Sequence, residues 1–398
     1  MSKHNLVILA GAACLPFVSH AQIVTDGSTG AQVTLNDLDV EVGESLGSRA
    51  GNNLFHSFET FNIQIGGSAT FTGSSEITNV ISRVTGGDVS NIQGVLSSTV
   101  GDADFYFINP AGVTFSEGGS VDVPASFHLS TADELRFDDG AVFSSSSSAT
   151  SVLSIAAPEA FGFLGDGTGS INLDNGSVTV GGLLDFGTQE SITLSAGNIA
   201  VSNSSAVVAP GAISIGAVGD GAANYDLQTG ADQLLDGDVT VNGLVGFDLF
   251  SQPDNLLIEA GSINVSEASS GLLSGPEGGM RLVSRDLNIS DNADVVGLGT
   301  IDIETTNQVT ILSGARVGSS VLFGAGGNVA ISAGRLVIDG EGSDRSTGVF
   351  SQVLPGEGGT SGDIEITIED TALIENGGTI SNSNFGVGDA GNLSLIHI

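Results

Sequence analysis

Residues 103–123, ADFYFINPAGVTFSEGGSVDV, contain the local signals that decide the fold of this chain. Two apolar strands, at 105–108 and 113–115, flank a turn made of Asn109, Pro110, Ala111 and Gly112. This order is typical of a type I turn, because Asn accepts a local hydrogen bond, Pro sets φ at the second position and Gly takes the last. Both strands are almost wholly apolar, which predicts that both of their faces are buried.

Short alternating strands continue along the rest of the chain, for example GSVTVGG and GSINVSE, each bounded by Gly, Asn, Asp or Ser. Such spacing is a sheet signal. No segment carries a convincing helical stripe. The nearest, NNLFHSFETFNI, places apolar side chains at Leu54, Phe55, Phe58 and Phe61 and is either one helical turn or a capping segment.

A degenerate unit recurs, in which Gly-Asn or Gly-Asp precedes an alternating strand. Its copies begin at Gly197, Gly327, Gly362 and Gly391. A strand with one or two core-facing residues per pass cannot bury them alone, so the copies must stack. The sequence therefore predicts an all-β parallel β-helix with coils of ~20 residues and Asn ladders at its corners. A barrel or a β-sandwich uses the same alternation, but irregular repeats over hundreds of residues favour the β-helix.

The charge narrows the classes of partner. The 398 residues include 46 acidic and nine basic side chains, a formal charge of −37, and the only lysine is Lys3. A polyanion repels phosphate backbones and anionic lipid surfaces, which disfavours nucleic-acid binding and electrostatic membrane adsorption. A solvated acidic surface is a better interpretation than a dedicated cation site.

The N-terminus is predicted to be a signal peptide, residues 1–21. An apolar run at 6–18 precedes Ser19-His20-Ala21, so we expect cleavage after Ala21 and export from the cytoplasm. Cys14, the only cysteine, lies in this leader. A lipidated N-terminus is the alternative, which Gly11 disfavours because a leucine-like residue is expected there. Cleavage leaves a chain without disulfides.

Catalytic patterns are weak. GESLG offers Ser45 as a nucleophile, with His56 or His128 as its base, but we expect both histidines on strand or cap surfaces. Asp138 and Asp139 are an acidic pair that a β-helical polysaccharide enzyme could use. Such an enzyme also needs a carboxylate-arginine cluster on one face of the solenoid. With so few arginines we predict no enzymatic activity.

Metal and cofactor sites are not predicted. The segment GDGTGSINLDNG offers oxygen ligands for calcium but lacks the regular Gly-Gly-x-Gly-x-Asp spacing, so turn chemistry is the better interpretation. We expect no metal and no cofactor.

Several ordered motifs resemble one family. GNNLFHSFETFNI, ITNVISRVTGGDVSNIQGVL, ADFYFINPAGVTFSEGGSVDVPASFHLSTAD and PEAFGFLG follow one another as in the haemagglutination-activity domain of filamentous haemagglutinin-like proteins, the exoproteins of two-partner secretion. The resemblance covers residues 22–165. It implies a right-handed β-helix with an N-terminal capping region. It also implies recognition by the periplasmic soluble domains of an outer-membrane transporter, which threads the chain out unfolded.

The same resemblance marks a transporter-recognition turn. Asn109, Pro110 and Gly112 match the Asn-Pro-Asn-Gly motif of the family, while Ala111 departs from its second Asn. That departure puts any side-chain role at this position in doubt. The family's other Asn-Pro turn is not found, so recognition through it is not carried over.

The expected organisation is a signal peptide at 1–21, a two-partner secretion domain at 22–165 and degenerate solenoid repeats at 166–392. Residues 393–398 match the translation of a sequencing adapter, and we expect them to be non-native. The alternative is that GNLSL continues the repeat. We also expect the chain to be truncated.

The expected function is that of an adhesin. We expect it to use the Sec machinery and a dedicated outer-membrane transporter, to lie outside the cell or on its surface, and to bind an unidentified host or cell-surface receptor. The alternatives are the delivery part of a contact-dependent toxin or haemolysin and, less favoured, a β-helical polysaccharide-active enzyme.

Overall fold

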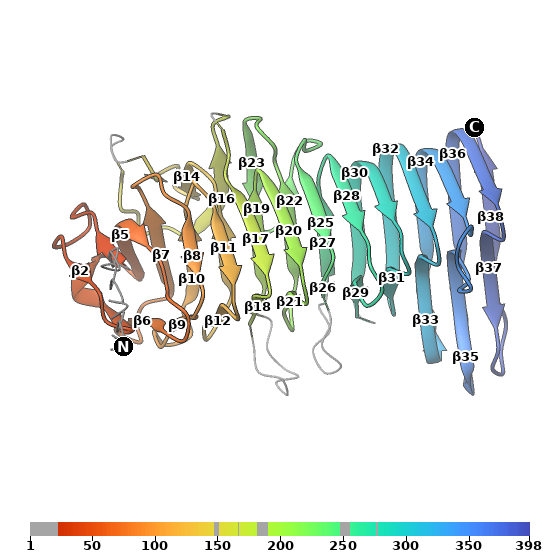
Figure 1. The fold of residues 1–398 in the computed structure, drawn as a ribbon, viewed down its shortest axis with the longest axis horizontal. Coiled ribbons are helices and arrows are strands. Elements are labelled where there is room, and N and C mark those ends of the chain that lie inside the picture. Colours follow the sequence, from red (N-terminus) through yellow and green to blue (C-terminus); the bar gives the residue numbers. More distant parts are fainter. Residues whose placement is uncertain (1–22, 147–150, 166, 181–189, 247–254, 276–277) are drawn as a thin grey trace, which may run out of the picture.

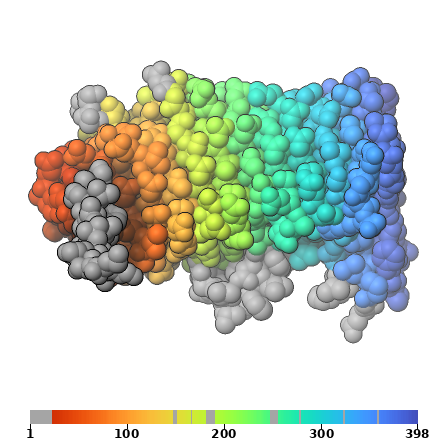
Figure 2. All heavy atoms as spheres, in the orientation of Figure 1, coloured from red at the N-terminus to blue at the C-terminus, as the bar shows by residue number. Residues whose placement is uncertain are grey.

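The computed structural model describes residues 23–398 except 147–150, 166, 181–189, 247–254 and 276–277. The predicted signal peptide lies outside the described residues. Coils stack along one axis into a rod, from a cap near β2 (Thr34–Leu35) to β37 (Thr379–Asn384) and β38 (Leu393–His397) at the other end (Figure 1). The space-filling view shows the same elongated body (Figure 2). None of the helical structure in the described ranges is long and apolar enough to cross a bilayer.

Three parallel ladders form the sides of the rod. The first ladder contains β5 (Asn53–Phe61), β7 (Asn79–Val84), β10 (Asp104–Ile108), β13 (Phe127–Ser130), β19 (Ile192–Ala196), β22 (Ile213–Ala217), β27 (Asn255–Glu259), β30 (Gly279–Ile289), β32 (Thr300–Leu312), β34 (Val329–Asp339), β36 (Ile364–Glu375) and β38 (Leu393–His397). The second contains β8 (Ser90–Ile92), β11 (Val113–Ser116), β17 (Ser170–Asp174), β20 (Asn198–Ser202), β25 (Asp238–Val241) and β28 (Ser262–Val265), and continues in the C-terminal halves of β30, β32, β34 and β36.

The third ladder contains β3 (Asp39–Gly43), β6 (Ser68–Thr72), β9 (Val95–Ser98), β12 (Ser120–Asp122), β18 (Ser177–Thr179), β21 (Ala206–Val208), β26 (Leu244–Val245), β29 (Gly271–Ser274), β31 (Asp294–Gly297), β33 (Arg316–Ala325), β35 (Gly348–Thr360) and β37 (Thr379–Asn384). The expected right-handed parallel β-helix is confirmed. The expected coil length of ~20 residues holds for the coil in which Ile192 pairs with Ile213, 21 residues later. Other coils are longer: Val329 pairs with Ile364, 35 residues later.

An antiparallel cap closes the N-terminal end. β1 (Ile23–Thr25) pairs with β2 (Thr34–Leu35) and with β5, and β4 (Ser48–Ala50) follows the 3-10 helix η1 (Glu44–Leu46) and also pairs with β5. β5 in turn pairs in parallel with β7. The segment that contains Phe55 and Phe58 is therefore a strand shared by the cap and the first coil, and the alternative of a helical turn is wrong.

The main core fills the rod, because alternate residues of all three ladders point inward. Near the cap it is rich in phenylalanine. Phe61 and Phe107 have ring centroids 4.9 Å apart, and those of Phe71 and Phe105 are 4.8 Å apart. Further along, isoleucine, valine and leucine take over the inward positions.

An antiparallel sheet covers part of the outside of the first ladder. This outer sheet has the order β15 (Val142–Ser144), β14 (Glu134–Phe137), β16 (Pro158–Phe163), β23 (Ala223–Asp226) and β24 (Gly230–Ala231). Its Phe137, Phe143 and Phe161 pack on outward residues such as Tyr106 and Ile108 in a second apolar cluster. The prediction of burial on both faces is thus confirmed for β10.

The same prediction is wrong for β11, where burial alternates and Thr114 is partly exposed. The physical reason is that the outer sheet covers the first ladder and leaves the second open to solvent on its outward side.

Glycine explains the recurring unit at the corners. Four glycines stack at the corner that precedes the last strands of the first ladder, β32, β34, β36 and β38: Gly299, Gly327, Gly362 and Gly391. A methyl group on Gly362 would clash with the carbonyl of Gly327. The copy at Gly197 belongs instead to the corner before the second ladder. The four copies therefore come from two different corners, which accounts for their irregular spacing.

The residue after each glycine forms the expected ladder of side chains. Asn328 Oδ1 accepts a hydrogen bond from the backbone N–H of Asp363 at 2.8 Å, and Asp363 Oδ1 accepts one from Asn392 N–H at 2.6 Å. At the second corner, Asn198 Oδ1 accepts from Asp238 N–H at 2.8 Å. Each side chain thereby satisfies a backbone donor of the next coil.

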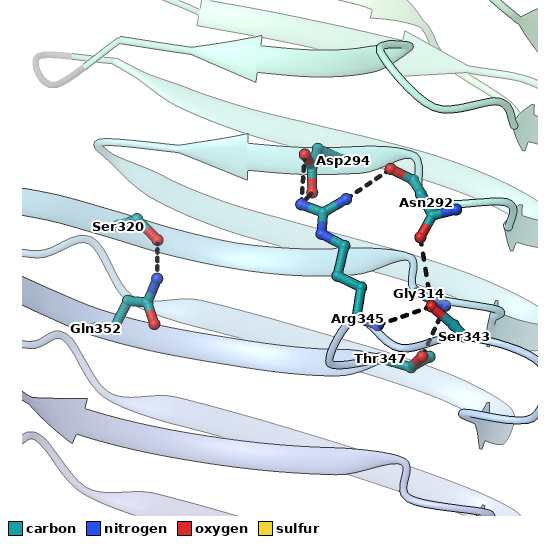
Figure 3. A network of polar contacts seen from close by, with 8 residues as sticks. All are labelled: Asn292, Asp294, Gly314, Ser320, Ser343, Arg345, Thr347 and Gln352. Atoms are coloured by element: carbon teal, nitrogen blue, oxygen red, sulfur yellow. Dashed lines mark hydrogen bonds and ion pairs between the residues drawn. The ribbon is translucent and has the colours of Figure 1, made fainter.

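A polar network connects three coils where β31, β33 and β35 of the third ladder begin (Figure 3). Arg345 donates to both carboxylate oxygens of Asp294 at 2.6 and 2.8 Å and to the backbone carbonyl of Asn292 at 2.7 Å. Its own backbone N–H donates to Ser343 Oγ at 3.0 Å, and Thr347 Oγ1 accepts from Gly314 N–H at 2.7 Å.

Candidate functional site

The turn after β10 is closed by Asn109. Gly112 N–H donates to the Asn109 carbonyl at 3.0 Å, and Ala111 N–H donates to Asn109 Oδ1 at 3.0 Å. The side-chain amide of Asn109 reaches the preceding coil, where it donates to the Asp88 carbonyl at 3.0 Å and to Ser90 Oγ at 2.9 Å. The side chain thus specifies the turn and fastens it to its neighbour.

The following coil lies directly on this turn. Gly169 N–H donates to the Pro110 carbonyl at 2.9 Å, and Gly169 sits so close to the turn that a Cβ there would meet the backbone of Ala111 and Gly112. Gly112 has φ +119°, a conformation that side chains rarely adopt. The sequence-predicted residues are therefore brought together at one corner, the same corner that Gly197 occupies further along.

Burial limits what this corner can offer in the folded rod. Asn109 is fully buried, Gly112 is buried, and Pro110 and Ala111 are half-buried. The amide and carbonyl of Asn109 are already used within the protein. Ala111 contributes only its backbone to the turn, so the turn forms without the second Asn of the family motif.

The sequence did not reveal a second junction, at Arg83. Its guanidinium donates to Ser57 Oγ at 2.8 Å, to Ser28 Oγ at 3.0 Å in the cap and to the carbonyl of Ser144 in the outer sheet. It also lies 4.2 Å above the ring centroid of Phe143. Burial lowers the pKa of Arg83. One signal was available: a basic residue inside an apolar strand of a chain with nine Lys and Arg.

The structure does not assemble a serine-histidine pair. Ser45 is exposed in η1, whereas His56 is buried inside the core with its ring centroid 5.2 Å from that of Phe71. No hydrogen bond joins Ser45 to either His56 or His128, all three of which are described. Burial lowers the pKa of His56 to about 4.

The expectation that both histidines lie on surfaces is wrong. His56 takes an inward position of β5 between the inward Leu54 and Phe58. His128 points outward from β13 but lies beneath the outer sheet, stacked on Tyr106 at a centroid distance of 4.4 Å, and burial lowers its pKa to about 3. Neither imidazole is therefore a base for an exposed substrate.

Asp138 and Asp139, the acidic pair, do not form one site and have different surroundings. Asp138 lines a cavity of about 500 Å³ between the first ladder and the outer sheet, together with Asp104 and His128. Asp139 accepts hydrogen bonds from Ser154 Oγ at 2.7 Å and Ala141 N–H at 2.9 Å, and the bond from Ser154 lowers its pKa. Asp139 therefore stabilises a turn.

Residues 167–176 of the candidate calcium segment form β17 and the turns beside it, and Asp166 lies outside the described residues. Asp174 accepts from Asn175 Nδ2 at 3.2 Å and from Asn203 Nδ2 at 2.7 Å, and Asn175 has φ +54°. In the part of the chain that the structure describes, no group of three His, Cys, Asp or Glu side chains is placed to hold a metal ion.

A carboxylate-arginine cluster does exist on one face, in a groove of about 710 Å³. We name this the acidic groove. It lies outside the first ladder beside the β23–β24 hairpin, and its charged lining residues are Asp232, Glu259, Arg281, Asp302, Glu304 and Glu369. The sequence could not reveal it, because its charged residues are spread along the chain from Asp232 to Glu369.

Stacking of successive coils creates the cluster. Arg281 of β30 pairs in register with Asp302 of β32. Glu259 of β27 pairs with Val283 of β30, which in turn pairs with Glu304 of β32. Arg281 donates to the two oxygens of Glu304 at 3.1 and 3.2 Å and lies 3.9 Å from Asp302. Burial and the neighbouring Glu304 raise the pKa of Asp302.

A family comparison gives the class of this β-helical protein, the secretion domain of two-partner secretion exoproteins. The family model of the TPS secretion domain matches residues 21–275 of the 398. Because this is more than half of the chain, the protein belongs to that family, a filamentous haemagglutinin-like exoprotein family. The match is longer than the stretch 22–165 on which the sequence resemblance rests.

Two solved structures are similar. The HMW1 secretion domain from Haemophilus influenzae has a TM-score of 0.54 and 16% identity, with 87% of this chain and 96% of that chain covered. The filamentous hemagglutinin secretion domain has a TM-score of 0.38 and 17% identity, with 94% and 99% covered. The first likeness supports the β-helical fold. No curated protein sequence matches the chain.

Proposed function

We propose that this two-partner secretion exoprotein is a filamentous adhesin, released from the cell or displayed on its surface. Its N-terminal domain, residues 22–165, addresses it to a dedicated outer-membrane transporter after export by Sec. Membership of the TPS family carries this proposal. Binding to a receptor on another surface, without turnover, is the activity that a long rod of side-chain-lined faces supports best.

The turn of Asn109, Pro110 and Gly112 is the proposed recognition element. Burial of Asn109 in the rod supports a specific order of events. The transporter binds the turn and its flanking strands before the coil has closed, when the Asn109 amide and the strand edges are still free. Outside the cell the same side chain then closes the corner.

Folding of the chain as it leaves the transporter pore gives secretion its outward direction. Each coil pairs with the one before it through all three ladders, as β10 does with β7 and β13. Solenoid stability is a sum of coil and nearest-neighbour contributions. Each emerging coil therefore adds to those already folded and opposes return through the pore. Proline substitutions in a mid-rod strand such as β25 should stall release at that coil; normal release would contradict this step.

The test is secretion of the full chain into the medium with and without the outer-membrane transporter encoded nearest to it. Asn109→Ala and Gly112→Val are compared with Asn172→Ala, an exposed Asn on the next strand of the second ladder. Release that requires the transporter and falls only in the first two variants supports the proposal. Equal release without the transporter overturns it.

A further inference from the structure

The cavity of about 500 Å³ between the first ladder and the outer sheet is named here the covered cavity. Its floor comes from strands of the first ladder, and its roof comes from the outer sheet and the turns of that sheet. Backbone hydrogen bonds hold the roof in place: Leu227 N–H donates to the Glu159 carbonyl at 2.9 Å, and Asp138 N–H donates to the Ala157 carbonyl at 3.1 Å. The cavity is therefore preformed by the two layers.

Two buried polar side chains line the floor of the covered cavity and lack partners there. Tyr106 is only 4% exposed, and its hydroxyl makes no hydrogen bond to any residue that the structure describes. His128 is 6% exposed, and its Nδ1 lies 3.1 Å from Thr193 Oγ1, whereas its Nε2 has no partner among the described residues. Buried polar groups are nearly always hydrogen-bonded. Both atoms are therefore free to contact a ligand in the cavity.

The floor offers hydrogen-bond acceptors. Burial lowers the pKa of His128 to about 3, so the imidazole is neutral, and Nε2 is an acceptor when Nδ1–H donates to Thr193. Asp104 is half-buried, accepts one hydrogen bond from Ser126 N–H at 3.1 Å and has no basic partner. Burial and the nearby Asp104 raise the pKa of Tyr106. A primary ammonium group carries three donors and no acceptor, which suits the phenolic oxygen, the imidazole nitrogen and the carboxylate.

The rim of the covered cavity adds negative charge at separate points. Asp138 and Glu159 are exposed and their carboxylates pair with no described residue, Asp226 lies beside them, and no Lys or Arg lines the cavity. A cleft lined by one sign of charge concentrates ligands of the opposite sign. These carboxylates do not converge, because no group of three His, Cys, Asp or Glu in the described ranges is placed to hold a metal ion. The charge pattern thus suits a cation whose charges are spaced apart.

The aromatic rings of the floor have no open face. Tyr106 lies in register between Ile81 and His128, and its ring centroid is 4.4 Å from that of His128. A quaternary ammonium group is recognised over the open face of an aromatic ring. Only the edge of Tyr106 is available, so the cavity selects N–H donors. Pro158 and Leu227 line the same cavity and offer apolar surface to methylene groups.

We propose that the covered cavity binds a linear diamine or polyamine. One primary ammonium group lies on the floor against Asp104, Tyr106 and His128, and a second lies at the rim carboxylates. The cavity volume is within the range of ~300–1,000 Å³ found for small-ligand sites. Such a ligand contacts both layers and joins the outer sheet to the first ladder. This inference goes beyond the adhesin proposal and does not depend on it.

The experiment is calorimetric titration of the full chain with hexamethylenediamine in about 0.15 M salt, which screens diffuse attraction to the acidic surface. Hexamethonium is the matched control, because it keeps both charges and the six-carbon spacing and removes every N–H donor. Calcium tests a compact divalent cation. We expect saturable binding of one hexamethylenediamine per chain, and binding at least roughly tenfold weaker for each of the other two.

Matched variants locate the site. Tyr106→Phe removes only a hydroxyl that has no partner within the protein, and Asp104→Asn removes the floor charge and keeps an acceptor for Ser126 N–H. Asp102→Asn removes the same charge from an exposed position outside the cavity. Circular dichroism checks that all three fold.

We expect roughly tenfold weaker binding in each of the first two variants and the wild-type affinity in Asp102→Asn. That result supports the proposal. Equal affinity for hexamethonium or calcium, an unchanged affinity in Tyr106→Phe or Asp104→Asn, the same loss in Asp102→Asn, or the absence of saturable binding overturns it.

Discussion

Asn109 and Asp88 connect two adjacent coils: the side-chain amide of Asn109 donates a 3.0 Å hydrogen bond to the backbone carbonyl of Asp88. This contact couples the specification of a local turn to the stacking of the solenoid. Removal of Asn109 therefore changes both the turn and the neighbouring coil.

We predict that Asn109→Ala lowers the free energy of unfolding by ~1–3 kcal/mol, because it leaves the buried Ser90 hydroxyl and the Ala111 N–H without their Asn109 partner. Asn109→Asp should lose a comparable amount, since it keeps the acceptor and loses the donor. Urea unfolding measures both. Asn172→Ala is the control, and unchanged midpoints in all three variants would contradict the prediction.

The stacked glycines at the first corner give a second prediction. Gly362→Ala should cost ~1–3 kcal/mol, because the new methyl group meets the backbone of Gly327, which cannot move without breaking the ladder. Gly221→Ala is the control, since open space surrounds that position. Thermal unfolding and limited proteolysis compare them. Equal stability of the two variants would show that the corner relaxes freely.

The Arg345–Asp294 pair (Figure 3) should depend on geometry more than on charge. Both side chains are about one-third exposed, so the ion pair itself contributes at most ~1 kcal/mol. Arg345→Lys keeps the charge but loses the planar guanidinium, whose Nη2 donates to both Asp294 oxygens while Nη1 donates to the Asn292 carbonyl. We expect Arg345→Lys to be nearly as destabilising as Arg345→Met in urea unfolding. Full stability of the lysine variant would refute this.

Acidification should weaken the cap through His56. Its pKa falls from 6.5 to about 4 on folding, so the neutral form is favoured in the folded state. The stabilisation is complete above the unfolded pKa and is lost as pH falls from 6.5 towards 4, by up to ~3 kcal/mol. His128, with a pKa of about 3, adds a loss of the same sign.

The measurement is urea unfolding of wild type and His56→Leu across that window. The variant should have the flatter profile. Carboxylates with a raised pKa, such as Glu259, titrate in the opposite sense and are common to both proteins. Parallel profiles would show that His56 does not contribute.

Alternation of apolar and polar residues, with glycine and asparagine at the bends, determined the β-helix before any tertiary information. Asn109, Pro110 and Gly112 also specified their turn locally, because each acts on backbone within three residues. These features depend on residues close together in the chain, so the sequence alone predicts them.

Only the tertiary structure decided which coils meet. Phe127 pairs with Ile192, 65 residues later, because the chain leaves the rod, builds most of the outer sheet and returns. The burial of His128, the contacts of Arg83 and the acidic groove all follow from such returns. Their cause is the stacking of ladders and of an added sheet, which brings together residues whose separation along the chain carries no periodic signal.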